Sequence, residues 1–149
     1  MENSTLTASA IMSFTEKLED DSSAFYEKLA KKFDEGREVF LGFAQNGRKN
    51  KTHLVRTYQE TISDALETAF SFEGLILTDY DFESALAKAT GFSEALATSL
   101  EIEDKASKLY SQIAEQAQSL LATIPGAFSR VAKKRRSQKE ILQRMLDGA

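Results

Sequence analysis

Two glutamates, each followed by a tyrosine, are the residues whose spacing suggests chemistry in this chain. Glu19 stands seven residues before Tyr26, and Glu103 stands seven residues before Tyr110. Two carboxylates buried together cannot both remain ionised without compensation, because desolvation and mutual repulsion raise their pKa values. If both glutamates face the interior, a group that neutralises them must lie nearby.

The segments that carry these pairs belong to an internal repeat. Residues 18–30 align without gaps on residues 102–114, with Glu, Asp, Ser, Tyr and Ala at matching places. A weaker match links a later apolar pattern of each half: Phe40, Phe43, Ala44 and Leu54 against Phe128, Val131, Ala132 and Leu142. Two helix pairs from one duplicated hairpin are the economical account, and chance similarity between periodic helices is the alternative.

Helices must position these residues, because apolar side chains recur at helical spacing along most of the chain. We expect Gly36 to close the first helix in the left-handed conformation, Gly91 to stop a short helix and Ser93 to cap the next. Pro125 suits the first turn of the last helix. The second helix could break at residues 45–50, which contain Asn-Gly. The predicted helices cover residues 11–33, 39–72, 83–90, 93–120 and 125–149.

Composition limits both the fold class and the chemistry. The chain has 149 residues, 42% of them apolar and 28% charged, with one Pro and seven Gly. These values favour one soluble domain, residues 1–149, built from long helices. The absence of Cys excludes disulfides, thiolate catalysis and zinc-ribbon or iron–sulfur ligation, and the single His limits imidazole chemistry. We therefore expect an all-α four-helix bundle in which a long connection with a short helix joins the second and third long helices.

No segment predicts export or membrane insertion. The first residues lack a basic region followed by an apolar one, and no run of about 18 apolar residues occurs. We expect a cytoplasmic protein without membrane contact.

The repeated Glu–Tyr spacing resembles the rubrerythrin-like branch of the ferritin-like superfamily. That family has a Glu seven residues before a Tyr on the first and third long helices. The run Phe-Ser-Glu-Ala-Leu at residues 92–96, leading to Glu103, is also similar to its third helix. The resemblance covers essentially the whole chain and implies a ferritin-like bundle with a di-iron centre.

The family's second feature, Glu-x-x-His on the second and fourth long helices, is missing. The corresponding positions hold Gly47 and Asn50 in one half and Arg135 and Gln138 in the other. A di-iron centre needs about four carboxylates and two imidazoles. We therefore expect no metal cofactor; the alternative is iron held by Glu19 and Glu103 with auxiliary groups.

We expect Arg135 to take over the metal's charge, because a guanidinium can bridge two carboxylates with paired hydrogen bonds. Gly47, at the matching place, would leave room for this long side chain. The alternative is a shifted helix register in which Arg135 points to water. The predicted network comprises Glu19, Tyr26, Gly47, Asn50, Glu103, Tyr110, Arg135 and Gln138.

The remaining polar features are expected at the surface. Net charge alternates in sign from one predicted long helix to the next. The basic run at residues 133–136, with Lys139, Arg48, Lys49 and Lys51, could bind an anion or nucleic acid. A solvated helix is the preferred interpretation, because the pI is about 5.1 and four successive residues point all round a helix. His53 is expected at the rim of the second helix.

A group of apolar residues near the connection is more than one four-helix core can bury. It is a candidate homodimer surface, and the alternative is that the connection folds back over its own bundle. The group comprises Phe70, Phe72, Leu75, Ile76, Leu77, Tyr80 and Phe82.

These observations favour a non-enzymatic interaction or structural module, acting as a homodimer. The first alternative is a residual metal-dependent redox or peroxide-handling enzyme. The second alternative is a DNA-associated protein that uses the basic clusters. Metal content distinguishes the non-enzymatic module from the redox enzyme, and salt-dependent DNA binding tests the DNA-associated alternative.

Overall fold

The computed structural model describes residues 6–61, 71–72, 77, 80–117 and 123–148. The all-α prediction is confirmed, and the described part adds one antiparallel pairing of two-residue strands, β1 with β2. The elements are β1 (Leu6–Thr7), α1 (Ala8–Lys32), a 3₁₀ turn η1 (Asp34–Gly36), α2 (Arg37–Thr61), β2 (Ser71–Phe72), α4 (Phe82–Lys88), α5 (Phe92–Gln116) and α6 (Thr123–Gly148).

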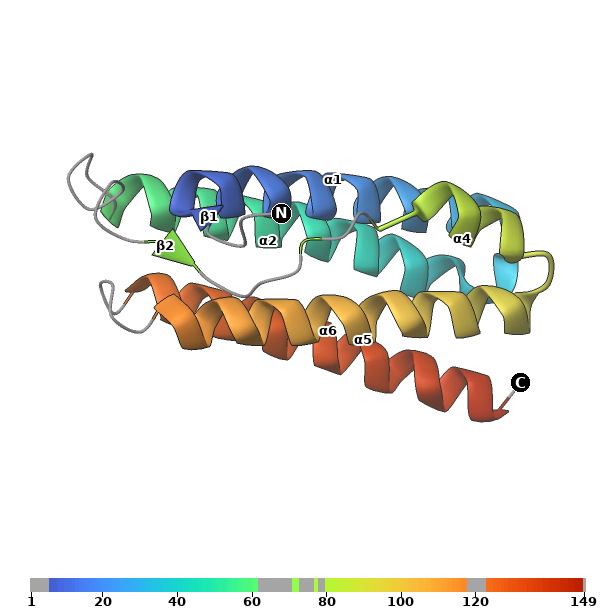
Figure 1. Ribbon diagram of the computed structural model, residues 1–149. Helices are drawn as coiled ribbons and strands as arrows, with labels where there is room; N and C mark the ends of the chain where they lie inside the picture. Colours follow the sequence, from blue (N-terminus) through green and yellow to red (C-terminus); the bar gives the residue numbers. More distant parts are fainter. Residues whose placement is uncertain (1–5, 62–70, 73–76, 78–79, 118–122, 149) are drawn as a thin grey trace, which may run out of the picture.

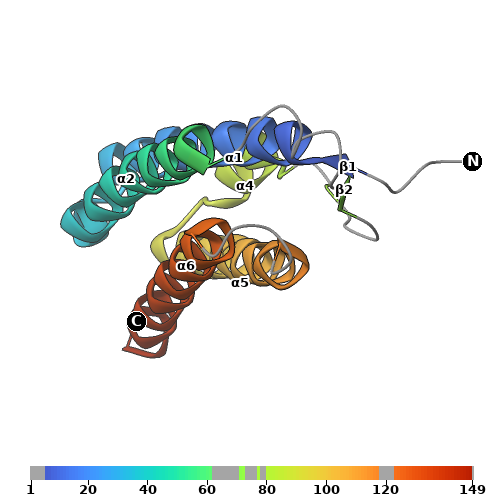
Figure 2. The ribbon, with the colours of Figure 1, turned by 90° about the vertical axis from the view of Figure 1, so that its left-hand side faces the viewer.

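The long helices form two hairpins that lie in two layers. α1 packs along α2 and α5 packs along α6, while α2 and α6 make the main contact between the layers. Figure 1 shows the four helices running along the long axis of the molecule, and Figure 2 shows the two layers end-on. The short helix α4 contacts both α1 and α5, so it covers the junction between the layers.

The core has two apolar clusters separated by a polar layer. One cluster contains Ile11, Leu54 and Ile113, and the other contains Phe40 and Leu142. On each long helix, the buried residues between these clusters are polar or are glycine. The helices bury one side at spacings of three and four residues, as a helix with one apolar face requires. No helix in the described ranges is both long enough and apolar enough to cross a membrane.

The first helix ends differently from the prediction. α1 stops at Lys32, and Phe33 caps it with φ −127°. Gly36 lies in the following 3₁₀ turn, outside the left-handed region, so its predicted conformation is wrong. Gly36 is required for space instead: a Cβ there would lie 2.9 Å from the rings of Phe40 and Phe92.

The second helix does not break where its sequence is weak. α2 continues through residues 45–50, because burial of its flanks by α1 and α6 outweighs the cost of about 1 kcal/mol for a helical glycine. The predicted extension to Phe72 is wrong, since Ser71 and Phe72 pair with β1. Residues 62–70 lie outside the described part of the chain.

The start of α5 also differs. Gly91, not Ser93, is the N-cap, and no side chain caps this end. The carbonyl of Gly91 accepts from the Ala95 N–H at 2.9 Å, so the helix begins two residues earlier than predicted. α4 ends at Lys88, before Gly91 can stop it. Pro125 lies in the first turn of α6, as predicted.

The described members of the apolar group near the connection pack on this chain. Leu77, Tyr80 and Phe82 are partly buried against the core, and Phe82 stacks at 6.2 Å on Tyr80. They favour the alternative in which the connection folds back. Phe70, Leu75 and Ile76 lie outside the described residues, and the homodimer stays a prediction.

Alanine substitutions at Gly36 and Gly42 should change the free energy of unfolding in opposite directions. Gly36→Ala should destabilise the protein by about 1 to 3 kcal/mol, because the new methyl meets two aromatic rings. Gly42→Ala should stabilise it by about 0.5 to 1 kcal/mol, because Gly42 is helical and its Cβ would meet no atom within 4 Å. Urea unfolding measures both values; equal effects would contradict the packing around Gly36.

Candidate functional site

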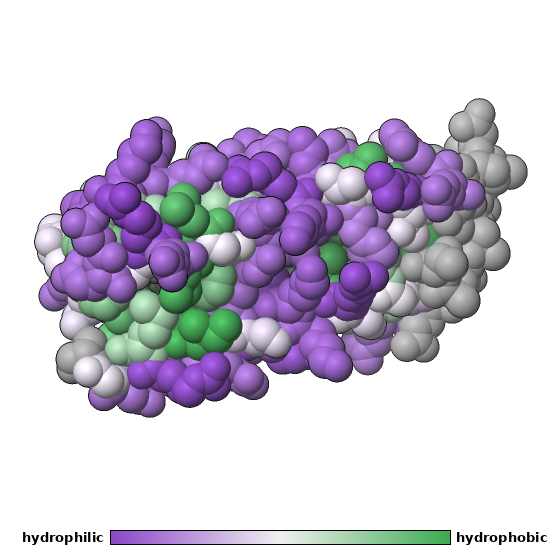
Figure 3. Space-filling view, turned by 180° about the vertical axis from the view of Figure 1, so that it is seen from behind, coloured by the Kyte–Doolittle hydropathy of each residue, from purple (hydrophilic) through white to green (hydrophobic). Residues whose placement is uncertain are grey.

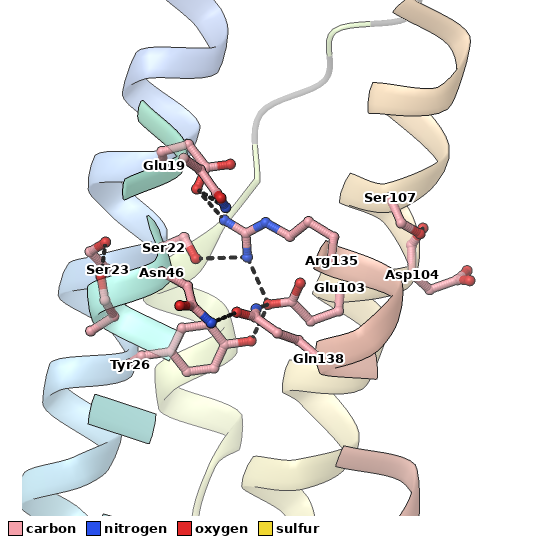
Figure 4. Close-up of polar contacts among 12 residues, drawn as sticks. Glu19, Ser22, Ser23, Tyr26, Asn46, Glu103, Asp104, Ser107, Arg135 and Gln138 are labelled. Carbon is pink, nitrogen blue, oxygen red and sulfur yellow. Dashed lines mark hydrogen bonds and ion pairs between the residues drawn. The ribbon is translucent and has the colours of Figure 1, made fainter. Parts of the chain in front are cut away.

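A buried arginine lies at the centre of the polar layer. From α6, Arg135 extends between α1 and α5, where its Nη2 is 2.6 Å from Glu19 Oε1 and its Nη1 is 2.7 Å from Glu103 Oε2. Its side chain is 1% exposed and both carboxylates are fully buried. Nη1 also donates to Ser22 Oγ at 3.2 Å. One cation therefore joins both helical hairpins (Figure 4).

The two tyrosines bind crosswise. The hydroxyl of Tyr26 donates to Glu103 Oε2 at 2.5 Å, and that of Tyr110 donates to Glu19 Oε2 at 2.6 Å. Each glutamate thus binds the tyrosine of the other half and not the one seven residues after it. The repeat places both pairs in equivalent positions, and the packing of the hairpins exchanges their partners.

Side-chain amides complete the network. Asn50 Nδ2 donates to Glu19 Oε1 at 3.3 Å, and Gln138 Nε2 donates to Glu103 Oε2 at 2.9 Å. These two bonds are equivalent under the repeat, since Asn50 and Gln138 occupy matching positions. Asn46 Nδ2 then donates to Gln138 Oε1 at 2.9 Å and fixes the orientation of that amide.

Sequence reasoning missed two members of this network, Ser22 and Asn46. Ser22 has no polar counterpart in the repeat, because the matching residue is Ala106. Asn46 lies in the segment interpreted as a possible break, which drew attention away from its side chain. Helical spacing could have identified both residues, because Ser22 lies three residues after Glu19 and Asn46 lies four residues before Asn50.

Gly47 lies where α1 and α2 approach each other, and its predicted role of leaving room for Arg135 stays a prediction. A Cβ at this position would clash with Ser23 Oγ and lie 3.2 Å from the backbone oxygen of Glu19. Ser23 Oγ in turn donates to the carbonyl of Ala44 at 2.8 Å. The missing side chain therefore lets α1 and α2 approach closely.

Burial controls the electrostatics of the site. Desolvation raises the pKa of Glu103, although Arg135 and the Tyr26 hydrogen bond act in the opposite direction. Burial and the nearby glutamates raise the pKa values of Tyr26 and Tyr110 well above their usual range, so both remain hydrogen-bond donors. Burial disfavours the charge of Arg135, but its attraction to both glutamates raises its pKa overall.

Three buried side-chain atoms of the polar layer have no hydrogen-bond partner in the described part of the chain: Ser99 Oγ, Glu103 Oε1 and Arg135 Nε. The Oε2 atom of Glu103, by contrast, accepts from Tyr26, Arg135 and Gln138. Three donors on one oxygen are typical of an ionised carboxylate. Burial is the largest cause of the raised pKa of Glu103, and the negative charge of Glu19 makes a smaller contribution in the same direction.

The residues present do not fit a di-iron centre. Such a centre takes about four carboxylates and two imidazoles, and the polar layer offers Glu19 and Glu103 with Arg135 between them. Within the described ranges, no three or more His, Asp or Glu side chains gather so that they could hold a metal. His53, the only histidine, is half-buried elsewhere on α2. A fixed guanidinium beside both carboxylates also opposes a second cation by charge.

Comparison with known proteins finds no family model, no curated protein and no solved structure that matches this chain. The resemblance to the rubrerythrin-like branch rests on the Glu–Tyr spacing and the repeated helix pairs. The crosswise tyrosines and the matched amides are further features of this chain's own geometry.

Removing the central cation should destabilise the fold in a pH-dependent way. Arg135→Ala leaves two buried carboxylates without a counter-charge, which should lower the free energy of unfolding by about 3 to 5 kcal/mol at neutral pH. The pKa of a carboxyl in the folded variant then rises above its unfolded value, so proton uptake favours the folded state. The deficit should therefore shrink as the pH falls toward about 5.

Urea unfolding of the variant and of wild type across that pH range measures the effect. Adding Glu103→Gln to Arg135→Ala should recover part of the loss, because it removes one of the two facing charges. A deficit under about 0.5 kcal/mol at every pH would contradict the central role of Arg135.

The close approach of α1 and α2 can be tested at Gly47. Gly47→Ala should destabilise the protein by about 1 to 3 kcal/mol, because the methyl clashes with Ser23 Oγ. Ser23→Ala in the same chain should restore part of this loss by removing the clashing oxygen. Thermal melting of the two single variants and the double variant gives the coupling energy; strictly additive effects would show that the two residues do not compete for space.

Proposed function

We propose that this chain is a ferritin-like four-helix bundle of the rubrerythrin-like kind whose metal site has become an ion-pair network, and that it acts as a non-enzymatic structural or interaction module. In this proposal residues 62–91 form the long connection between the hairpins and α4 is its short helix. One observation carries the proposal: the guanidinium of Arg135 lies between Glu19 and Glu103, with both ion pairs buried.

The symmetry of the polar layer supports descent from a duplicated metal site. Each hairpin supplies a glutamate, a tyrosine for the opposite glutamate, and an amide from the paired helix. The symmetry of the metal-site positions fails where Gly47 matches Arg135. In the family these positions hold metal-bridging glutamates, so this single asymmetric exchange replaces two anions with one cation.

The properties of the guanidinium support a structural role. It is planar, permanently charged and able to donate to two carboxylates at once, so it can hold the hairpins in one register. It cannot change oxidation state, and Asn50 and Gln138 stand where the family places its imidazoles. The residual redox alternative therefore lacks the ligands that its cofactor would need.

A buried ion network contributes more to uniqueness of packing than to stability. Deleting Arg135 would be costly, whereas exchanging the whole network for apolar residues could stabilise the bundle. Because an apolar replacement could be more stable, the role of the network in this proposal is to specify how the four long helices pack against one another. The outer surfaces of a helix arrangement held this way are available for contacts with other molecules.

Metal content tests the proposal directly. The chain should be expressed in iron-supplemented medium, purified without chelators and assayed by mass spectrometry of the metal. We expect far less than one iron per chain, because Arg135 opposes a second cation beside the carboxylates. About two irons per chain would contradict the proposal and favour a metal-dependent enzyme.

A gain of metal binding tests the ancestry of the site. Arg135→Glu with Gln138→His rebuilds Glu-x-x-His on α6 beside Glu19 and Glu103. We expect this double variant to bind about one Co²⁺ per chain, seen by visible absorption and by a rise in melting temperature. Adding Glu103→Gln should weaken that binding. Failure of the double variant to bind Co²⁺, or equal binding by wild type, would contradict an inherited metal geometry.

A further inference from the structure

One outer face of the molecule carries a row of basic side chains, of which the arginines and the lysine are cationic. Arg48, Lys49, His53 and Arg56 recur at helical spacing along α2 and, with Gln45 and Thr52, line a shallow surface cavity of about 400 Å³. Figure 3 looks onto the side of the molecule formed by α2 and α6 and shows a broad hydrophilic area there.

Helix α6 adds two cations to this row. Burial, followed by the positive charges of Arg130, Lys134 and Arg56, lowers the pKa of His53. Arg130 and Lys134 are one turn apart on α6, so this helix flanks His53 along the row. We call the surface formed by Arg48, Lys49, His53, Arg56, Arg130 and Lys134 the cationic face.

Most of this charge has no acidic partner. Arg48 pairs with Glu27 at 2.7 Å, but the described part of the chain places no carboxylate within ion-pair distance of Lys49, Arg56, Arg130 or Lys134. Other cations on the same helices are neutralised: Lys51 pairs with Asp20 and Lys139 with Asp104. In a chain of net charge −4, this local excess of cations is unbalanced.

The basic run at residues 133–136 does not act as one patch. Arg135 is buried in the polar layer, Arg136 Nη1 donates to Ser111 Oγ at 3.2 Å, and Lys134 faces the His53 side. The run therefore divides between the core and different surfaces, and only Lys134 joins the cationic face. The positive charge of the cationic face comes from both α2 and α6, so the basic run at residues 133–136 does not by itself predict this face.

We propose that the cationic face binds a linear polymer of phosphates through the phosphates themselves. Residues 45–56 extend over about 16 Å of helix and carry three cations of this face, and α6 adds two more, so the face suits a repeating anion and exceeds the size of one phosphate. Its lining contains no Phe, Tyr or Trp on which bases could stack. Recognition therefore depends on charge spacing, and the face lies outside the buried network and does not depend on it.

Binding can be measured with two phosphate polymers. Fluorescent inorganic polyphosphate and single-stranded DNA of mixed sequence would each be titrated with the full chain. At about 50 mM salt we expect binding of polyphosphate, weakened by about 50-fold to about 100-fold at about 200 mM salt if four or five phosphates are contacted. DNA binding as well would extend the source to nucleic acid.

Several results would overturn the proposal. They are the absence of polyphosphate binding at low salt, binding of DNA alone, equal binding of poly-glutamate of matched charge, and equal competition by orthophosphate at the same phosphate concentration. The last two would indicate a general acidic partner or a small-anion site.

Charge reversal locates the site. Arg56→Glu with Lys134→Glu should weaken polyphosphate binding by at least about tenfold, because two unpaired cations are replaced by anions. Lys28→Glu with Lys31→Glu changes the net charge equally on the exposed side of α1 and should leave binding nearly unchanged. Arg56→Gln with Lys134→Gln should give an intermediate loss, and circular dichroism checks the fold of each variant. Equal losses in the two charge-reversal variants would overturn the proposal.

The only histidine of the chain provides an internal probe. Phosphates bound beside His53 would offset the cations that lower its pKa, so polyphosphate should raise the pKa measured from the His53 ring signals by NMR. Unchanged ring signals in the bound chain would place the polymer elsewhere and overturn the proposal.

Discussion

The guanidinium of Arg135 is shared by two buried carboxylates, and the packing of the long helices depends on this interaction. Glu19 comes from the α1–α2 hairpin and Glu103 from the α5–α6 hairpin, so the ion pairs bring together elements far apart in sequence. Neither carboxylate could be buried alone without a large desolvation penalty. The tyrosine hydroxyls and the amides supply the remaining hydrogen bonds, and the two apolar clusters close over both ends of this layer.

Duplication explains why the layer has so much internal order and where that order fails. Equivalent side chains of the two halves make equivalent bonds to the glutamates, and the tyrosines exchange partners across the interface. A guanidinium can serve both carboxylates at once, so one arginine is enough. The matching position, Gly47, allows α1 and α2 to approach. At these matching positions, Arg135 on α6 neutralises the buried glutamates, whereas Gly47 on α2 permits close packing against α1.

The interior and the cationic face treat charge in opposite ways. Inside, Glu19, Glu103 and Arg135 are paired with one another, and burial raises the pKa of Glu103. Outside, on α2 and α6, several cations have no carboxylate partner among the described residues, and, after burial, three of them lower the pKa of His53. Water screens the outer charges, so their repulsion is tolerable in the folded chain and can be relieved by a bound anion. The buried network therefore specifies the architecture, while the surface charge suits recognition.

The sequence by itself determined the helical class, the approximate ranges of the helices and the residues gathered around Arg135. Apolar periodicity is a local signal, and the repeat aligns Glu19 with Glu103 and Gly47 with Arg135. Only the tertiary structure decided the crosswise binding of Tyr26 and Tyr110, the inclusion of Ser22 and Asn46, and the continuity of α2 through Gly47. These features depend on how closely two hairpins approach and on burial that outweighs local helix propensity, and neither quantity is encoded in residue spacing along one chain segment.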